Sequence, residues 1–155
     1  MKKQLVIGYG NPLRRDDGVA HHIIERLREQ TPSDALELLI CHQLTPELVE
    51  RLHDVGRVIL IDAREGRHAG EILVEQVFPT EVFGAFTHNV TPSSLLGAAL
   101  EWYDVRPQCY IVSITGADFS IGEGLSEAVA VAVPLAVSVV GRLCGQTEGA
   151  MSHDA

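Results

Sequence analysis

The sequence predicts an α/β protein: a three-layer αβα sandwich around a mostly parallel, twisted sheet of about five strands. Short apolar runs that suit buried parallel strands alternate with longer segments in which apolar residues recur at helical spacing. Turn and helix-start signals separate these segments along the whole chain. The chain has 155 residues, which is enough for one such domain with its own core and too few for two.

Three strands and two helices are expected in the first half of the chain. Continuous apolar runs predict strands over residues 3–8, 35–41 and 57–62, and periodic apolar residues predict helices over about 17–29 and from 46 onward. Thr45 is the expected N-cap of the second helix, and Pro46 suits its first position because no amide donor is needed there. The third strand is the most apolar and ends on the carboxylate of Asp62.

Two strands and two helices complete the expected sandwich. They are strands over residues 70–77 and 109–114 and helices from residue 91 and over about 127–143. Residues 70–77 alternate apolar and polar side chains, which predicts an edge strand that can run antiparallel. Thr91 and Pro92 form a second cap-and-proline start. Ser126 is the expected cap of the last helix, and Pro134 predicts a kink within it.

Composition excludes several classes of protein. The chain has 12 Lys and Arg against 21 Asp and Glu, a formal net charge of −9, which argues against nucleic acid as a partner. Its three cysteines lack close pairing and predict neither a disulfide framework nor a thiolate zinc site. The apolar stretch 128–140 is too short to span a bilayer. We expect a cytoplasmic monomer without a membrane partner, with one domain over residues 1–147 and a flexible tail over 148–155.

The most informative segment is GYGNPLRRDDG at residues 8–18, where an apolar strand runs into a glycine turn and two adjacent carboxylates stand at an expected helix start. One carboxylate has an ordinary explanation because helix starts favour negative side chains, and Asp16 is the expected N-cap. The second, Asp17, suggests a partner such as a cation or a scissile bond. The segment is not a dinucleotide fingerprint, because Leu13 replaces the third glycine and two carboxylates would repel a pyrophosphate.

Polar candidates follow the ends of the predicted strands. Ligands bind outside the carboxyl ends of such strands, so Asn11, Asp17, His42 and Asp62 should meet at one rim. Two carboxylates and an imidazole can hold a divalent ion such as nickel or zinc. The alternative is a charged first-turn residue at Asp17 and a loop cap at Asp62. His42 could be a ligand, a substrate contact or only a strand-end residue, and His88 could reach the rim from its loop.

Nucleophilic catalysis has little support. The chain contains no Gly-x-Ser-x-Gly elbow. Cys41 and His42 follow each other at a strand end, where successive side chains point to opposite faces. We therefore expect Cys41 to be buried and inert.

Several of these segments together resemble the hydrogenase maturation proteases, the endopeptidases that trim the C-terminus of the nickel-iron hydrogenase large subunit. The similarity runs from the first strand to the final helix and implies a phosphorylase/hydrolase-like sandwich. It rests on GYGNPL at residues 8–13, DDG at 16–18, VILIDA at 58–63 and THNVTP at 87–92.

The resemblance implies that Asp17 and Asp62 are catalytic and metal-site residues, together with a histidine from a later loop. In the family that histidine often follows the Ser/Thr-Pro pair, where this chain has Ser93, so His88 is the nearest substitute. The segment HQLTPEL beginning at His42 resembles a branch with a histidine at the second rim position, which makes His42 the other candidate. The expected substrate contacts are Asn11, Asp16 and His42.

The implied substrate is the large-subunit precursor with nickel already bound by its own cysteines. Nickel is then borne by the substrate, although another divalent ion could occupy the isolated protein. The ion could polarise the scissile carbonyl or lower the pKa of a bound water, or one Asp could act as general base with nickel serving only to position the tail. Two other classes stay open: a non-catalytic nickel-binding or docking factor, and a hydrolase of small nucleosides or peptides.

Overall fold

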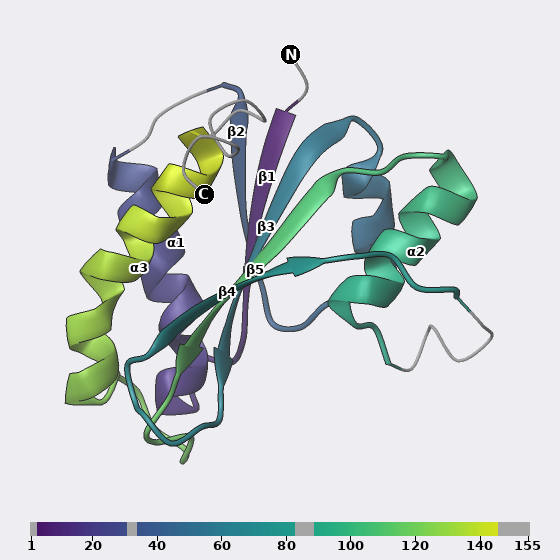
Figure 1. The fold of residues 1–155 in the computed structure, drawn as a ribbon. Helices are drawn as coiled ribbons and strands as arrows, with labels where there is room; N and C mark the ends of the chain where they lie inside the picture. The colour runs from purple at the N-terminus through teal and green to yellow at the C-terminus, as the bar shows by residue number, and fades with distance from the viewer. Residues whose placement is uncertain (1–2, 31–33, 83–88, 146–155) are drawn as a thin grey trace.

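A five-stranded sheet forms the middle layer of the fold (Figure 1). The computed structural model describes residues 3–30, 34–82 and 89–145. Its strands are β1 Lys3–Tyr9, β2 Leu36–Cys41, β3 Val55–Arg64, β4 Ile72–Val77 and β5 Gln108–Thr115, in the spatial order β2-β1-β3-β5-β4. Strands β1, β2, β3 and β5 are parallel, and β4 pairs antiparallel with β5 at one edge. The predicted mostly parallel sheet with one antiparallel edge strand is confirmed.

Helices cover both faces of the sheet and complete the three layers (Figure 1). On one face lie α1 Val19–Gln30 and α3 Glu127–Gly145, and on the other lie α2 Pro92–Tyr103 and the 3-10 helix η2 Pro46–Leu52. A short 3-10 helix, η1 Arg15–Gly18, precedes α1. Strand β3 explains why the central strands are apolar throughout, because Ile59 and Ile61 face α1 and α3 while Val58 and Leu60 face η2 and α2.

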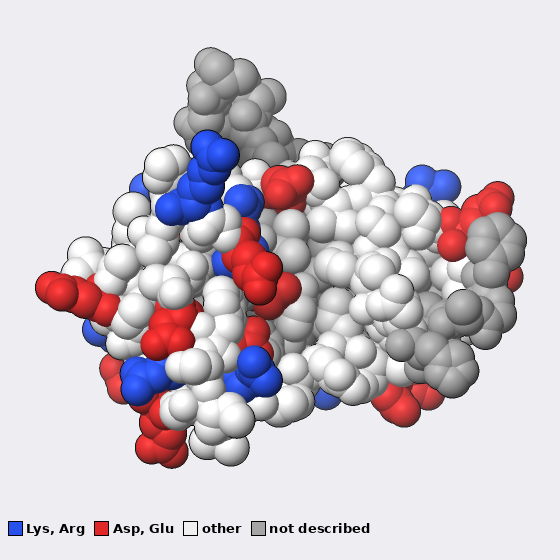
Figure 2. Space-filling model, turned by 90° about the horizontal axis from the view of Figure 1, so that it is seen from below, with Lys and Arg blue, Asp and Glu red and all other residues white. Residues whose placement is uncertain are grey.

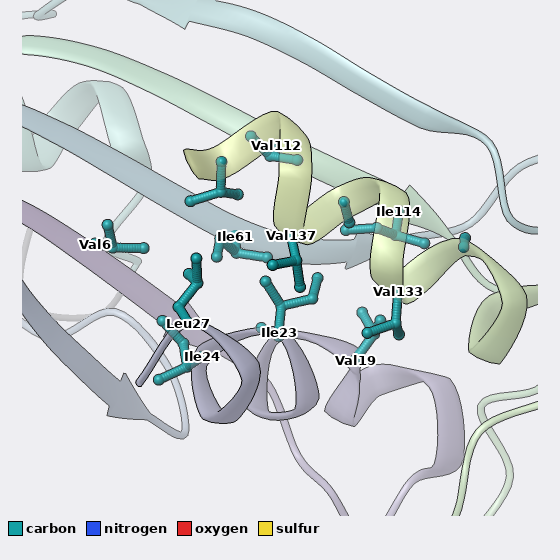
Figure 3. Packing of buried hydrophobic residues seen from close by; sticks show 14 of the residues in the cluster. Val6, Val19, Ile23, Ile24, Leu27, Ile61, Val112, Ile114, Val133 and Val137 are labelled. Carbon is teal, nitrogen blue, oxygen red and sulfur yellow. The ribbon is translucent and has the colours of Figure 1, made fainter. Parts of the chain in front are cut away.

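Figure 3 shows the core between the sheet and the first helix layer. Ile23 and Leu27 of α1 point toward Ile61 of β3, and Val137 of α3 closes the cluster from above. All four side chains are at most 4% exposed. Burial of each such side chain stabilises the fold by about 1.5–3 kcal/mol. This packing holds the N-terminal end of α1, and the turn before it, against the ends of β1 and β3.

Two helix starts differ from expectation. The first helix begins with a 3-10 turn over residues 15–18, and its α-helical part starts at Val19. The segment that begins at Pro46 is a 3-10 helix, and the side chain of Thr45 makes no capping hydrogen bond. Thr91 does cap α2, in a reciprocal capping box with Ser94. The first Thr-Pro pair therefore marks a turn of tighter helix, whereas the second starts an α-helix as predicted.

Helix α3 is long and apolar enough, over its 19 residues, to pass a length-and-composition test for a membrane span. Val129, Val133 and Val140 nevertheless lie in the core against α1 and the sheet, so α3 is a core helix as predicted. The helix continues on both sides of Pro134. The expected tail over 148–155 lies outside the described residues.

Candidate functional site

A cavity of about 430 Å³ opens where β1, β2 and β3 end. Asp17 from η1, Asp62 from β3 and His42 from the segment after β2 all line it, as the rim rule predicted. Residues 89–92 at the start of α2 also line it. Seen from below, where the parallel strands end, charged side chains gather mainly on the α1 and α3 side, and the side toward α2 is largely uncharged (Figure 2).

The glycine turn holds the Asp17 carboxylate in place. The backbone N–H of Asn11 donates to Asp17 Oδ2 at 2.8 Å, and a ring nitrogen of His21 lies 3.0 Å from the carbonyl oxygen of Gly10. Asn11 Oδ1 accepts from the N–H of Leu13 at 2.9 Å. The side chain of Asn11 thus shapes the turn itself, and a contact between Asn11 and substrate stays a prediction.

Gly10 is the residue that lets this turn pass so close to η1. Its φ of 144° lies in a region that side chains disfavour, and a Cβ there would come within 2.0 Å of the Asp17 carbonyl oxygen. We expect Gly10→Ala to lower the free energy of unfolding by at least about 2 kcal/mol, because strain and a backbone clash add. Chemical denaturation measures the loss.

Gly124→Ala is the matched control for this substitution. Gly124 also has a positive φ, 91°, but no atom lies within 4 Å of a Cβ built there. Its substitution tests strain alone, with an expected cost of about 1 kcal/mol. Equal losses for Gly10→Ala and Gly124→Ala would contradict the close packing of the turn.

Asp62 combines burial with a negative neighbour. Burial raises the pKa of its carboxyl group to about 6, and the charge of Asp17 acts in the same direction. The hydroxyl of Tyr9 donates to Asp62, and the N–H of Ala63 also bonds to it, and both contacts limit the rise. Burial and Asp62 together hold the pKa of Tyr9 far above its ordinary value, so Tyr9 keeps its proton and remains a donor. Asp62 can therefore exchange a proton near neutral pH.

Of the two candidate histidine ligands, the structure describes only His42. His42 is exposed and lines the cavity beside Asp17 and Asp62. His88 lies outside the described residues, and Asn89 is the next residue along the chain that lines the cavity. Among the described residues, no three His, Cys, Asp or Glu side chains come together as a ready metal centre. Within the described residues, Asp17 and Asp62 would therefore need further ligands to hold a divalent ion.

Asp16 differs from its predicted roles. It is fully buried, and the N-cap position of η1 is occupied by Arg14. Its carboxylate accepts from the N–H groups of Ala117 and Asp118 at 2.8 and 3.0 Å, and from the N–H and hydroxyl of Ser126 at 2.8 Å each. Burial acts to raise the pKa of Asp16, but these hydrogen bonds outweigh it and keep the pKa below its ordinary value. The predictions of an N-cap and a substrate contact at Asp16 are therefore wrong.

Asp16 joins the turn to the β5–α3 connection, residues 116–126. Further main-chain bonds support this joint: Arg15 N–H donates to Gly122 O at 3.0 Å, and Gly122 N–H donates to Leu13 O at 2.8 Å. Ser126 stands before α3 as predicted, but its hydroxyl donates to Asp16. The sequence did not predict this joint, because Asp16 and its partners lie about a hundred positions apart, and it did not predict the contact of Tyr9 with Asp62. The one sequence signal for the joint was the pair of adjacent carboxylates, because the cavity needs only one of them and the other is left for a structural role.

No protein-family model matches the chain, and no curated protein matches it. Several solved structures do match the chain. The hydrogenase maturating endopeptidase HybD from E. coli is similar, with a TM-score of 0.73 and 24% identity over 92% of this chain and 94% of that one. The NiFe hydrogenase maturation protease HycI from Thermococcus kodakarensis KOD1 has a TM-score of 0.74 at 18% identity, covering 94% of both chains. This chain has the fold of the nickel-iron hydrogenase maturation proteases.

A third structure of the maturation-protease fold, the hydrogenase 2 maturation peptidase from Thaumarchaeota archaeon SCGC_AB-539-E09, has a TM-score of 0.70 at 23% identity and covers 93% of this chain and 99% of that one. The fold implied by the sequence resemblance is therefore confirmed. At these identities the likeness establishes the fold alone, and the roles of individual residues depend on the geometry of the cavity.

Proposed function

We propose that the protein is an endopeptidase that removes the C-terminal extension of a nickel-iron hydrogenase large-subunit precursor after nickel insertion. The observation that supports this most directly is that Asp17 and Asp62, 45 positions apart, line one cavity in a chain with the maturation-protease fold. The nickel ion is part of the substrate, held by the precursor's own cysteines. Carboxylate and imidazole ligands suit such an ion, so Asp17, Asp62 and a histidine, His42 or His88, would approach it from the protease side.

The geometry suggests different roles for the carboxylates of Asp17 and Asp62. Asn11 N–H holds Oδ2 of Asp17 and so orients that group, which suits a role in recognising the cation. Asp62, with a pKa of about 6, suits the general base. It would take a proton from water as the oxygen attacks the scissile carbonyl carbon, and would return a proton to the amide nitrogen as the C–N bond breaks. The substrate's nickel would polarise the carbonyl or only position the tail.

The partner is a protein, and the surface around the cavity fits one. The largely uncharged side of the view in Figure 2 suits contact with a large subunit better than with a polyanion. The described cysteines, Cys41, Cys109 and Cys144, are all free, which is compatible with the proposed cytoplasmic location. The monomeric state stays a prediction.

Incubation of the purified protein with nickel-loaded precursor, followed by mass spectrometry, tests the proposal. We expect a shortened large subunit and a released C-terminal peptide, and an unchanged mass when the precursor carries no nickel. An intact nickel-loaded precursor in a stable complex would instead identify a non-catalytic docking factor. Turnover of small peptides or nucleosides without the precursor would favour the small-molecule hydrolase.

A further inference from the structure

Strand β2 forms one edge of the described sheet, beside the cavity. Among the described residues, β1 is the only strand that pairs with β2 (Figure 1). Ala35 O accepts from Gln4 N–H at 2.9 Å, and Cys41 O accepts from Gly10 N–H at 3.3 Å, so the odd-numbered residues face β1. Main-chain groups of alternate residues point to opposite edges of a strand. The N–H and C=O groups of Leu36, Leu38 and Ile40 therefore point outward.

The β2 edge lacks the features that usually prevent pairing with another chain. The segment LELLIC contains no proline and no lysine, and its register with β1 is uninterrupted. Its one charged side chain, Glu37, is paired with Arg51 of η2. Every residue of β2 is half-buried, and all of its side chains except that of Glu37 are apolar. Such an edge can accept an extended peptide as an added strand.

The position of β2 favours this edge over the edge at β4, at the other end of the described sheet. The cavity is lined from the ends of β1, β2 and β3, and β4 and β5 contribute nothing to its lining among the described residues. Residues 42–46, which directly follow β2, line the cavity, so the edge leads straight into it. Strands lie about 4.8 Å apart, so a strand added outside β2 would lie about 14 Å from β3 and Asp62. About four extended residues cover that distance, at about 3.3 Å each.

We propose that the outer edge of β2 binds the C-terminal extension of the substrate as an antiparallel strand, downstream of the scissile bond. This inference rests on the proposed function. A peptide that leaves the cavity along β2 runs against the direction of β2, because β2 itself runs toward the cavity. Pairing of this kind reads main-chain groups and tolerates different side chains, and it holds the extension while the bond at Asp62 is hydrolysed.

Amide hydrogen exchange on the unmodified protein tests the pairing directly. The probe is a synthetic peptide of the ten residues that follow the scissile bond of the precursor which the protein cleaves. We expect the amides of Leu38 and Ile40 to exchange at least about tenfold more slowly with the peptide bound, while those of Leu39 and Cys41, which already face β1, change little. N-methylation of the peptide at alternate residues should weaken binding with a period of two.

Two proline variants form a matched pair for cleavage assays. Leu38→Pro removes one outward N–H, and Val74→Pro does the same on β4, where Glu71 O accepts from Thr115 N–H and so places Val74 outward. Prolines are tolerated where the N–H faces solvent. We expect Leu38→Pro to raise KM for the precursor at least about tenfold with little change in kcat, and Val74→Pro to change neither.

The outcomes separate this inference from the proposed function. Cleavage of the precursor without protection of Leu38 and Ile40 would overturn the docking edge and leave the protease intact, whereas a precursor that is never cleaved would overturn the function itself. Protection of these amides without peptide, lost on dilution, would assign the edge to a second copy of the chain and would also overturn the inference. If Leu38→Pro unfolds, the exchange experiment decides alone.

Discussion

Replacement of Asp62 by asparagine is expected to abolish precursor processing and, at the same time, to stabilise the protein at pH 8. The amide keeps the shape of the carboxylate but can neither accept the proton of the attacking water nor carry the charge that faces the cation. Loss of a general base typically costs about 10²- to 10⁴-fold in rate. Mass spectrometry of the precursor after incubation measures the first effect, and denaturant unfolding at pH 8 and pH 4 measures the second.

The sign of the stability effect follows from the raised pKa of Asp62, about 6 in the folded protein against an ordinary 3.8. Between these two values the folded state binds more protons than the unfolded state, so stability declines as pH rises through that window. The penalty is complete above pH 6 and absent well below pH 4. A shift of this size corresponds to at most about 3 kcal/mol, and we expect about 1–2 kcal/mol because the cavity is open to water.

Asp118→Asn is the control of opposite sign. The hydrogen bonds from Ser120 hold the pKa of the Asp118 side chain below its ordinary value. The charge of Asp118 therefore stabilises the fold at pH values above that ordinary pKa. Its substitution should lower stability at pH 8, where Asp62→Asn raises it. Full processing by Asp62→Asn, or a loss of stability at pH 8, would contradict the role assigned to this buried carboxylate.

Replacement of Asp16 by alanine is expected to cause the largest loss of stability at a single polar residue. It removes the acceptor of four hydrogen bonds and leaves the partly buried N–H groups of Ala117, Asp118 and Ser126 without it. Hydrogen bonds to charged groups contribute about 1.5–3 kcal/mol each and are not additive, so we expect a loss of at least about 3 kcal/mol. Urea unfolding measures it. Processing should fall as well, because the turn that carries Asp17 would lose its joint to the β5–α3 connection.

Graded variants separate the carboxylate from its individual contacts. Ser126→Ala removes only the hydroxyl bond and should cost about 1–2 kcal/mol. The stabilising effect of Asp16 should be complete above the ordinary pKa of 3.8 and should be lost as pH falls from there through its lowered pKa, since over that range the unfolded state binds more protons than the folded state. An Asp16→Ala protein as stable as Ser126→Ala would show that the joint contributes little.

Much of the fold was predictable from local patterns in the sequence. The apolar run 58–61 predicted a central strand because a strand covered on both faces has no polar side, and it does lie between β1 and β5. The rule that ligands bind at the ends of parallel strands placed Asp17, His42 and Asp62 together, and all three line one cavity. The identical Thr-Pro signals at residues 45 and 91 nevertheless produced a 3-10 helix and an α-helix, since neighbouring packing decides between such closely related states.

The sequence by itself determined the layered α/β architecture and which strand ends carry acid, because hydrophobic periodicity and turn residues act over a few positions. Only the tertiary structure decided what each acid does. Asp16 and Asp17 are adjacent and chemically identical, yet one is buried against residues 117–126 and the other lines the cavity. Likewise, the proton affinity of Asp62 depends on Tyr9 and Asp17, which reach it only through the pairing of β1 with β3. Burial and charge act through space, and the neighbours that produce them are set by long-range packing.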